Sequence, residues 1–182
     1  MDVNVPSHPD YKFLYRDQPM DFLTYYQKLN IFLKKFSKST KMPIHFSIHP
    51  RTDSDEIKKI KTIIDSAICS QGNTLELIKD CKCVLQHQST TLSYAVLFKK
   101  PITILTNNEL EKSWYKGRTD STANYFNKPV VNMDHEIVNH KFLEVDDDIY
   151  NKYIDEYLRV PNSSEEPIWE NFSKYILKNN FN

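Results

Sequence analysis

Imidazole, guanidinium and hydroxyl side chains gather at three places where a predicted strand gives way to a loop. An imidazole can donate a hydrogen bond to a phosphate or transfer a proton, and a guanidinium can hold two phosphate oxygens at once. The three clusters are His49-Pro50-Arg51, Ser70-Gln71-Gly72-Asn73-Thr74 and His87-Gln88-Ser89-Thr90-Thr91. These residue types suit the binding of a phosphate-bearing ligand.

The third cluster stands at the start of a predicted helix, Leu92–Phe98. The first turn of a helix leaves backbone N–H groups unpaired and carries a partial positive charge, so it attracts anions. Ser89, Thr90 and Thr91 would add hydroxyl donors beside those N–H groups. A serine or threonine here also serves as an ordinary helix cap, and one residue can do both. Both interpretations stay open.

The candidates in the other clusters have structural alternatives as well. A single histidine at a strand end is often structural, but Arg51 two residues later favours phosphate contact for His49. His87 can instead stabilise its loop by bonding to the backbone. Thr74 can also cap the next helix, and Gly72 lies in the loop before it. Three other histidines lie in weakly patterned segments and receive no role: His8, His135 and His140.

The elements that must position these clusters alternate along the chain. Residues Asp21–Phe36 carry an apolar stripe with a period of about 3.6, which predicts an amphipathic helix. The segment Asp53–Lys61 is interpreted only as a charged connection, whereas the helix Leu92–Phe98 is apolar nearly all round and is expected in the core. The predicted strands are 44–48, 67–70, 83–86, 102–105, 129–132 and 142–145, and further helices are predicted at 75–80, 121–126, 149–158 and 165–177 with Pro167 in the first turn.

Alternating strands and helices predict an α/β fold, Rossmann-like, with one mostly parallel sheet and helices on both faces. The strands 44–48, 67–70, 83–86 and 102–105 are expected to be neighbours. Ligands bind at the carboxyl ends of such strands, so the three polar clusters should share one edge. The 182 residues suit a single domain, with a core of about 1–135 and a helical extension of about 147–180.

Composition excludes several classes of function. The 24 basic and 24 acidic residues cancel, so no overall field favours nucleic acid. Only Gly72 and Gly117 occur, too few for a P-loop or a dinucleotide fingerprint. Neither a zinc motif nor a G-x-S-x-G elbow is present, and residues 146–148 are interpreted as a solvated turn or a helix start. No metal and no cofactor are expected.

The chain is expected to be cytoplasmic. It contains no apolar run near the roughly 20 residues of a membrane span and no signal-peptide pattern, so contact with the inner membrane would be peripheral. The cysteines are interpreted as reduced, buried side chains: Cys69, Cys81 and Cys83.

The segment 77–102, with Ser89-Thr90 before a helix and Lys100-Pro101 before a strand, resembles the C-terminal domain of GT-B glycosyltransferases. His49-Pro50 followed by Ser89-Thr90 is similar to the paired HP and S-S/T motifs of bacterial capsule enzymes and sialyltransferases. The resemblance covers roughly residues 2–110 and includes the early segment Pro6-Ser7-His8-Pro9-Asp10. It implies that the histidine and the hydroxyl pair contact a donor nucleotide and its phosphate. CMP-linked sugars are favoured, UDP-linked sugars remain open, and the acceptor would be a glycan.

Enzymes of that family have two Rossmann-like domains, and this length has room for one. The resemblance therefore implies a donor-binding half, active as a hexosyl- or sialyltransferase once an N-terminal domain or a partner chain completes it. One alternative is a non-catalytic module of the same fold that binds a nucleotide or a partner during polysaccharide assembly. A flavodoxin-like or response-regulator-like module is disfavoured, because no phosphoacceptor aspartate follows a predicted strand.

Overall fold

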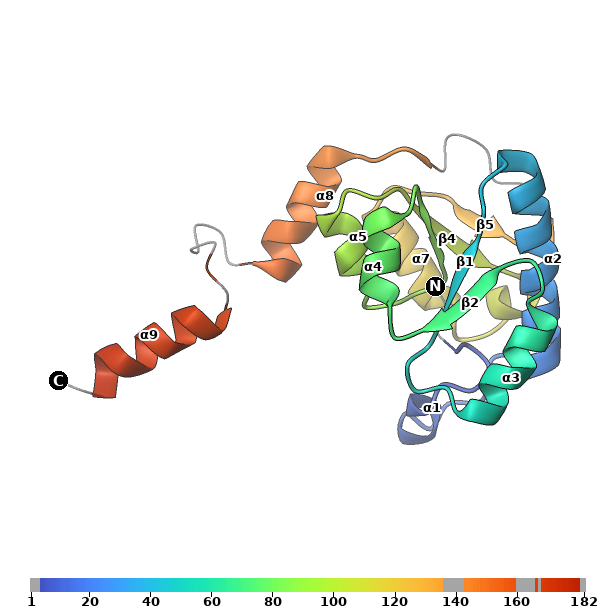
Figure 1. The fold of residues 1–182 in the computed structure, drawn as a ribbon, viewed down its shortest axis with the longest axis horizontal. Coiled ribbons are helices and arrows are strands. Elements are labelled where there is room, and N and C mark those ends of the chain that lie inside the picture. Colours follow the sequence, from blue (N-terminus) through green and yellow to red (C-terminus); the bar gives the residue numbers. More distant parts are fainter. Residues whose placement is uncertain (1–3, 136–142, 160–165, 167, 181–182) are drawn as a thin grey trace.

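The computed structural model describes residues 4–135, 143–159, 166 and 168–180. Strands and helices alternate, as predicted, and the arrangement is α/β (Figure 1). In chain order the elements are α1 (Asp10–Phe13), α2 (Phe22–Thr40), β1 (His45–Ile48), α3 (Ser54–Ile63), β2 (Ile68–Gln71), α4 (Thr74–Asp80), β3 (Val84–Gln86), α5 (Leu92–Leu97), β4 (Ile102–Thr106), α6 (Asn108–Glu111), α7 (Lys116–Tyr125), β5 (Val130–Asn132), α8 (Asp147–Tyr153), the π-helix η2 (Ile154–Leu158) and α9 (Ile168–Asn180).

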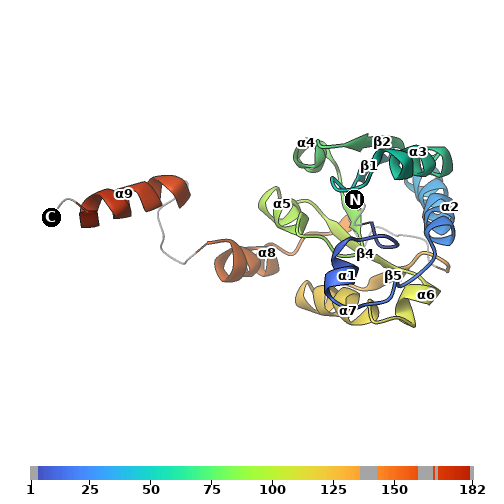
Figure 2. The ribbon, with the colours of Figure 1, turned by 90° about the horizontal axis from the view of Figure 1, so that it is seen from below.

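The strands form two small parallel sheets rather than the single sheet predicted. β1 pairs with β2, and β3, β4 and β5 pair in that order. Figure 2 shows β1 between β2 and the second sheet. Within each sheet the strands are parallel, so the carboxyl ends of its strands lie at one edge. The prediction of parallel strands is confirmed, but the prediction that all of them are hydrogen-bonded in one continuous sheet is wrong.

Apolar side chains pack on both faces of the β3–β4–β5 sheet. Alternation along β4 sends Leu105 into one cluster and Ile102 and Ile104 into the other. The first cluster is filled by the stripe of α2, from Tyr25 to Phe36, together with β1 and α3. The second is filled by α4, α5, α7 and α8. Figure 2 shows α3 and α4 beside the first sheet and α6 and α7 beside β4 and β5.

Helix α2 confirms the prediction made from its stripe and shows how its ends are fixed. The Asp21 carboxylate accepts a hydrogen bond from the backbone N–H of Thr24 at 2.8 Å, which satisfies a donor that the first turn leaves unpaired. At the other end Lys41 adopts a left-handed conformation with φ of 61° and stops the helix. Six apolar side chains of this helix are buried.

Three predicted elements differ from the structure. The charged segment after Asp53 is the helix α3, whose cap is the Asp53 carboxylate and whose fully buried residue is Ile60. Helix α5 is not buried all round, because Tyr94 and Leu97 are 41% and 50% exposed. Residues 143–145 form no strand, and Phe142 lies outside the described residues. Glu165 and Pro167, expected at the start of the last helix, also lie outside them.

The C-terminal helices differ in how they contact the rest of the molecule. Helix α8 packs on α5 and continues into η2, while α9 stands apart (Figure 1). Aromatic side chains of α9 are open to solvent, with Trp169 75% exposed and Tyr175 66% exposed. Among the described residues, none of the helices has the length and apolar character needed to cross a membrane.

Candidate functional site

A cavity of about 480 Å³ opens where β1 and β3 end. Its walls come from segments that are distant in the sequence: the start of the chain, the turns after the two strands, α7 and the α8–η2 helix. Lining side chains include His8, Asp10, Tyr11, His49, Gln88, Ser89, Thr90, Arg118, Tyr125, Tyr153 and Tyr157. The prediction that His49 and Ser89 share one cleft is confirmed.

His49 is held by contacts to its own turn and to β2. Its Nδ1 accepts a hydrogen bond from the backbone N–H of Arg51 at 3.2 Å. The side-chain amide of Gln71, the last residue of β2, donates to the His49 carbonyl at 2.9 Å. Burial, followed by the charges of His8 and Arg51, lowers the pKa of His49, while Asp10 opposes the shift. The imidazole is therefore neutral at pH 7, with Nδ1 occupied as an acceptor and Nε2 carrying the proton.

The hydroxyl turn after β3 is ordered by bonds among its own residues. The Ser89 and Thr91 hydroxyls are 2.7 Å apart, and the Thr91 N–H donates to the Ser89 oxygen at 3.3 Å. That N–H is thus engaged within the turn, contrary to the expectation that it faces a ligand. Ser89 and Thr90 line the cavity, and Thr91 does not. Helix α5, which follows, has only six residues.

Arg118 is the lining residue with a permanent positive charge. Its guanidinium donates to the Gln88 side-chain oxygen at 3.5 Å and lies over the Trp114 ring, 5.2 Å from the ring centroid. The carboxylate in the lining, Asp10, forms an ion pair with Arg51 at 3.3 Å. Because Arg51 offsets Asp10, the charge left facing the cavity is that of Arg118. An anionic ligand is therefore favoured.

The other predicted site residues lie outside the cavity lining. Arg51 is exposed and pairs with Asp10. The Thr74 hydroxyl lies 2.5 Å from that of Ser47, and Gly72 has φ of +89°, a conformation that favours glycine. His87 is buried, and its Nδ1–H donates to the Leu105 carbonyl at 2.7 Å. The predicted alternative for His87, a bond to the backbone, is what the structure shows.

Three tyrosines form an aromatic wall that the sequence did not identify. The rings of Tyr153 and Tyr157 lie 5.0 Å apart, and the Tyr125 ring is 5.7 and 5.5 Å from them. The Tyr125 hydroxyl donates to the Glu156 carboxylate at 2.7 Å. All three tyrosines line the cavity, opposite in chemical character to the polar turns. His8 was also missed, although its segment repeats the His-Pro dipeptide of residues 49–50.

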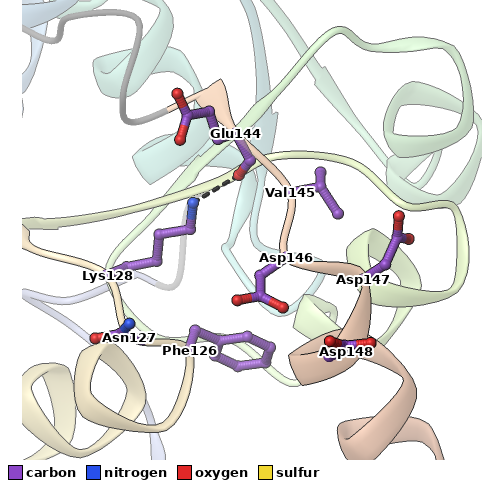
Figure 3. A pocket seen from close by; sticks show the side chains of 8 residues that line it. All are labelled: Phe126, Asn127, Lys128, Glu144, Val145, Asp146, Asp147 and Asp148. Carbon is purple, nitrogen blue, oxygen red and sulfur yellow. Dashed lines mark hydrogen bonds between the residues drawn. The ribbon is translucent and has the colours of Figure 1, made fainter.

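A second cavity, of about 470 Å³, is acidic (Figure 3). The Lys128 ammonium donates to the Glu144 carbonyl at 2.6 Å, as the dashed line shows. The Asp146 carboxylate caps α8 by accepting from the Ile149 N–H at 3.1 Å, so the acidic run is a helix start, as one interpretation predicted. Within the described ranges, no group of three or more histidine, cysteine, aspartate or glutamate side chains could hold a metal ion. Carboxylates at this cavity disfavour a phosphate.

Comparison with known proteins returns no family model, curated protein or solved structure that matches this chain.

Proposed function

We propose that this chain binds a nucleotide-sugar in the first cavity and is the donor-binding part of a glycosyltransferase for capsule or another surface polysaccharide. The observation that carries the proposal is the meeting of His49, after β1, with Ser89 and Thr90, after β3, in one cavity. The carboxyl ends of parallel strands are where α/β proteins bind their ligands. The volume of about 480 Å³ also lies within the usual range of small-molecule sites.

The polar end of the cavity supplies donors for the phosphate. Ser89 and Thr90 contribute hydroxyls, His49 contributes an Nε2–H, and Arg118 contributes a guanidinium. Each bond to a charged phosphate is stronger than one between neutral groups. In sugar transfer, His49 would hydrogen-bond to the departing nucleotide's phosphate or protonate it, which stabilises the leaving group.

The aromatic wall supplies a surface for the nucleoside. A nucleobase stacks on tyrosine with a gain of about 1–3 kcal/mol, and the gain depends little on which base is bound. Tyr157 is 63% exposed, so a ligand can reach its ring. Stacking of this kind accommodates CMP-linked and UDP-linked sugars alike.

A specific observation favours a second candidate, a non-catalytic nucleotide-binding module in polysaccharide assembly. Activation of a glycan hydroxyl requires a general base, and Asp10, the carboxylate in the lining, is held by Arg51 at 3.3 Å. A transferase would then obtain its base from an N-terminal domain or a partner chain. Sugar transfer by the purified 182-residue chain would exclude this second candidate.

Binding of CMP, UDP, GDP and their sugars, measured by thermal shift and calorimetry, tests the proposal. The double substitution Ser89→Ala/Thr90→Ala should weaken nucleotide affinity about tenfold or more, because hydrogen bonds to a charged group are worth about 1.5–3 kcal/mol. Thr62→Ala, which removes an exposed hydroxyl on α3, is the control and should change nothing. Loss of stability alone, with affinity unchanged, would mean that the hydroxyls only order the turn.

A further inference from the structure

Two copies of the same local structure lie side by side in the lining of the first cavity. In each, a histidine is followed by proline, and the histidine Nδ1 accepts the backbone N–H of the residue after that proline. The distance is 3.2 Å for Asp10 N to His8 and 3.2 Å for Arg51 N to His49. The two rings meet edge to face, with centroids 5.1 Å apart and planes at 64°. Both rings line the cavity.

The shared hydrogen bond fixes the same tautomer in both rings. A neutral imidazole carries one proton, so a ring whose Nδ1 accepts a hydrogen bond must carry its proton on Nε2. Within the described residues, neither His8 nor His49 uses Nε2 in a hydrogen bond to the protein. Each ring therefore keeps an Nε2–H that can donate to a ligand in the cavity that both rings line.

Charged and titratable neighbours come from each element that packs against the pair. Asp10 and Tyr11 belong to α1, Arg51 follows β1, and Arg118 belongs to α7. The Asp10 carboxylate lies 3.7 Å from the His8 Nδ1, a distance too long for a hydrogen bond, and it is paired with Arg51. Burial is the main reason that the pKa of both histidines is lowered, and arginine charges add to the effect. Both rings are thus neutral at pH 7 and able to gain a proton.

We infer that His8 and His49 form a two-imidazole clamp for the phosphate of a nucleoside monophosphate. The phosphate inserts at the two Nε2–H donors, with the Arg118 guanidinium as the fixed cation. A monophosphate carries nearly two negative charges at pH 7, whereas a phosphodiester carries one. Two imidazoles that can each gain a proton, beside one fixed cation, suit the larger charge.

The clamp deepens the proposed function, and its nucleoside specificity rests on that proposal. Sugar transfer from a nucleoside monophosphate sugar forms a bond between the sugar carbon and an acceptor hydroxyl oxygen and breaks the bond between that carbon and the phosphate oxygen. The hydroxyl proton passes to the base that the N-terminal domain or partner chain supplies. The electron pair stays on the phosphate, which changes from a monoanion to a dianion. A clamp that prefers the dianion stabilises the leaving nucleotide. His8 would be a second histidine, beside His49, that touches the phosphate.

Binding should also be linked to proton uptake. A phosphate dianion beside the rings favours their charged form and raises their pKa values from the lowered values of the free site. The complex then binds more protons than its separated components. By linkage, affinity for CMP should rise as the pH falls from 8 toward 6.5.

Calorimetry with CMP, cytidine and orthophosphate tests the clamp on the full chain. The substitution His8→Asn keeps a side-chain oxygen where Nδ1 accepts the Asp10 N–H, but it removes the Nε2–H donor. It should weaken CMP and orthophosphate binding about tenfold or more and leave cytidine binding unchanged. His49→Asn should behave in the same way. His135→Asn, a histidine outside the cavity lining, is the matched control.

Two further measurements make the result specific. Repeating the titrations in buffers of different ionisation enthalpy should show proton uptake with CMP in the wild type and less in His8→Asn. His8→Gln, which restores an amide nitrogen near the Nε2 position, should recover part of the lost affinity. If circular dichroism shows that His8→Asn is unfolded, the titration of His8→Gln tests the clamp in its place.

The outcomes separate the clamp from the proposed function. If His49→Asn weakens CMP binding and His8→Asn binds like the wild type, the clamp is wrong and the proposed function stands. If orthophosphate binds in a His8-dependent way but no nucleotide or nucleotide-sugar binds more tightly, the clamp stands and the proposed function is wrong. Absence of CMP and orthophosphate binding to the folded wild type overturns the clamp.

Discussion

His87 offers a test of the buried polar structure beneath the site. Its Nδ1–H donates to the Leu105 carbonyl at 2.7 Å, and its ring lies 5.5 Å from that of Tyr25. The Nε2 atom is buried and has no hydrogen-bond partner. Burial lowers the pKa of His87 from 6.5 to about 4, because an imidazolium there would lose its hydration. Acid should therefore destabilise the fold through this residue.

The magnitude follows from the pKa difference between the unfolded and folded states. The unfolded chain takes up the proton near pH 6.5 and the folded protein only near pH 4, so the unfolded state binds more protons between these values. The free energy of unfolding therefore falls as the pH falls through this window. A difference of about 2.5 units at 1.36 kcal/mol per unit gives a loss of about 3 kcal/mol.

The substitution His87→Phe removes the titration and keeps a ring in the position. At pH 7 the substitution should lower the free energy of unfolding by about 1–3 kcal/mol, because the Leu105 carbonyl loses its hydrogen-bond donor. Between pH 7 and pH 4 the wild type should lose about 3 kcal/mol more than the variant, so the two stabilities should meet or cross. Urea unfolding followed by circular dichroism at four pH values measures both, and carboxylate titrations shared by the two proteins cancel.

A constant stability difference across this pH range would refute the reasoning, because it would mean that the folded protein accepts the His87 proton as readily as the unfolded chain. His135→Phe is the matched control. It makes the same exchange at an exposed position, so the loss of stability that the buried His87 causes between pH 7 and pH 4 should remain.

Two further changes follow from local geometry. Asp53→Ala removes the carboxylate that accepts hydrogen bonds from the N–H groups of Asp55 and Glu56, both at 2.9 Å. It should lower the free energy of unfolding, measured in urea titrations, by about 1 kcal/mol, and the control Asp55→Ala should lower it less. Equal losses in the two variants would exclude the helix cap as the cause. Tyr157→Ala should weaken the binding of cytidine and CMP by about 1 kcal/mol or more, because a stacking surface is lost. Calorimetry measures this against the control Tyr15→Ala, which removes a 98% exposed ring outside the cavity lining. An unchanged affinity for cytidine would mean that the aromatic wall does not bind the nucleoside.

Strand positions could be predicted because their signals are local. The run Ile44–Ile48 ends at His49-Pro50, and proline cannot continue a hydrogen-bond ladder, so β1 had to stop there. Parallel strands then bring His49 and Ser89 to the same cavity, and the alternation of strands and helices in the sequence was enough to predict this. Helix α3 was missed because its charges obscure a narrow apolar stripe around Ile60.

The rest of the site depends on tertiary packing, which leaves little trace in the sequence. Arg118 and Tyr125 lie on α7, a helix without a marked apolar face, and reach the cavity only because α7 packs along β4. The cluster after β2 was expected in the site, but β1 separates β2 from the second sheet (Figure 2). Thr74 and Gln71 therefore support the β1 end, through Ser47 and His49, and do not line the cavity.

The division into two sheets has a mechanical consequence for the cavity. Backbone hydrogen bonds fasten β1 to β2 and β3 to β4, but β1 and β3 are joined through side-chain packing. The wall that carries His49 belongs to one body, and the wall that carries Ser89 belongs to the other. Packed bodies without a shared ladder can shear against each other while each keeps its own hydrogen bonds. A ligand that contacts both walls would link the two sheets, and its size would then determine the distance between them in the complex.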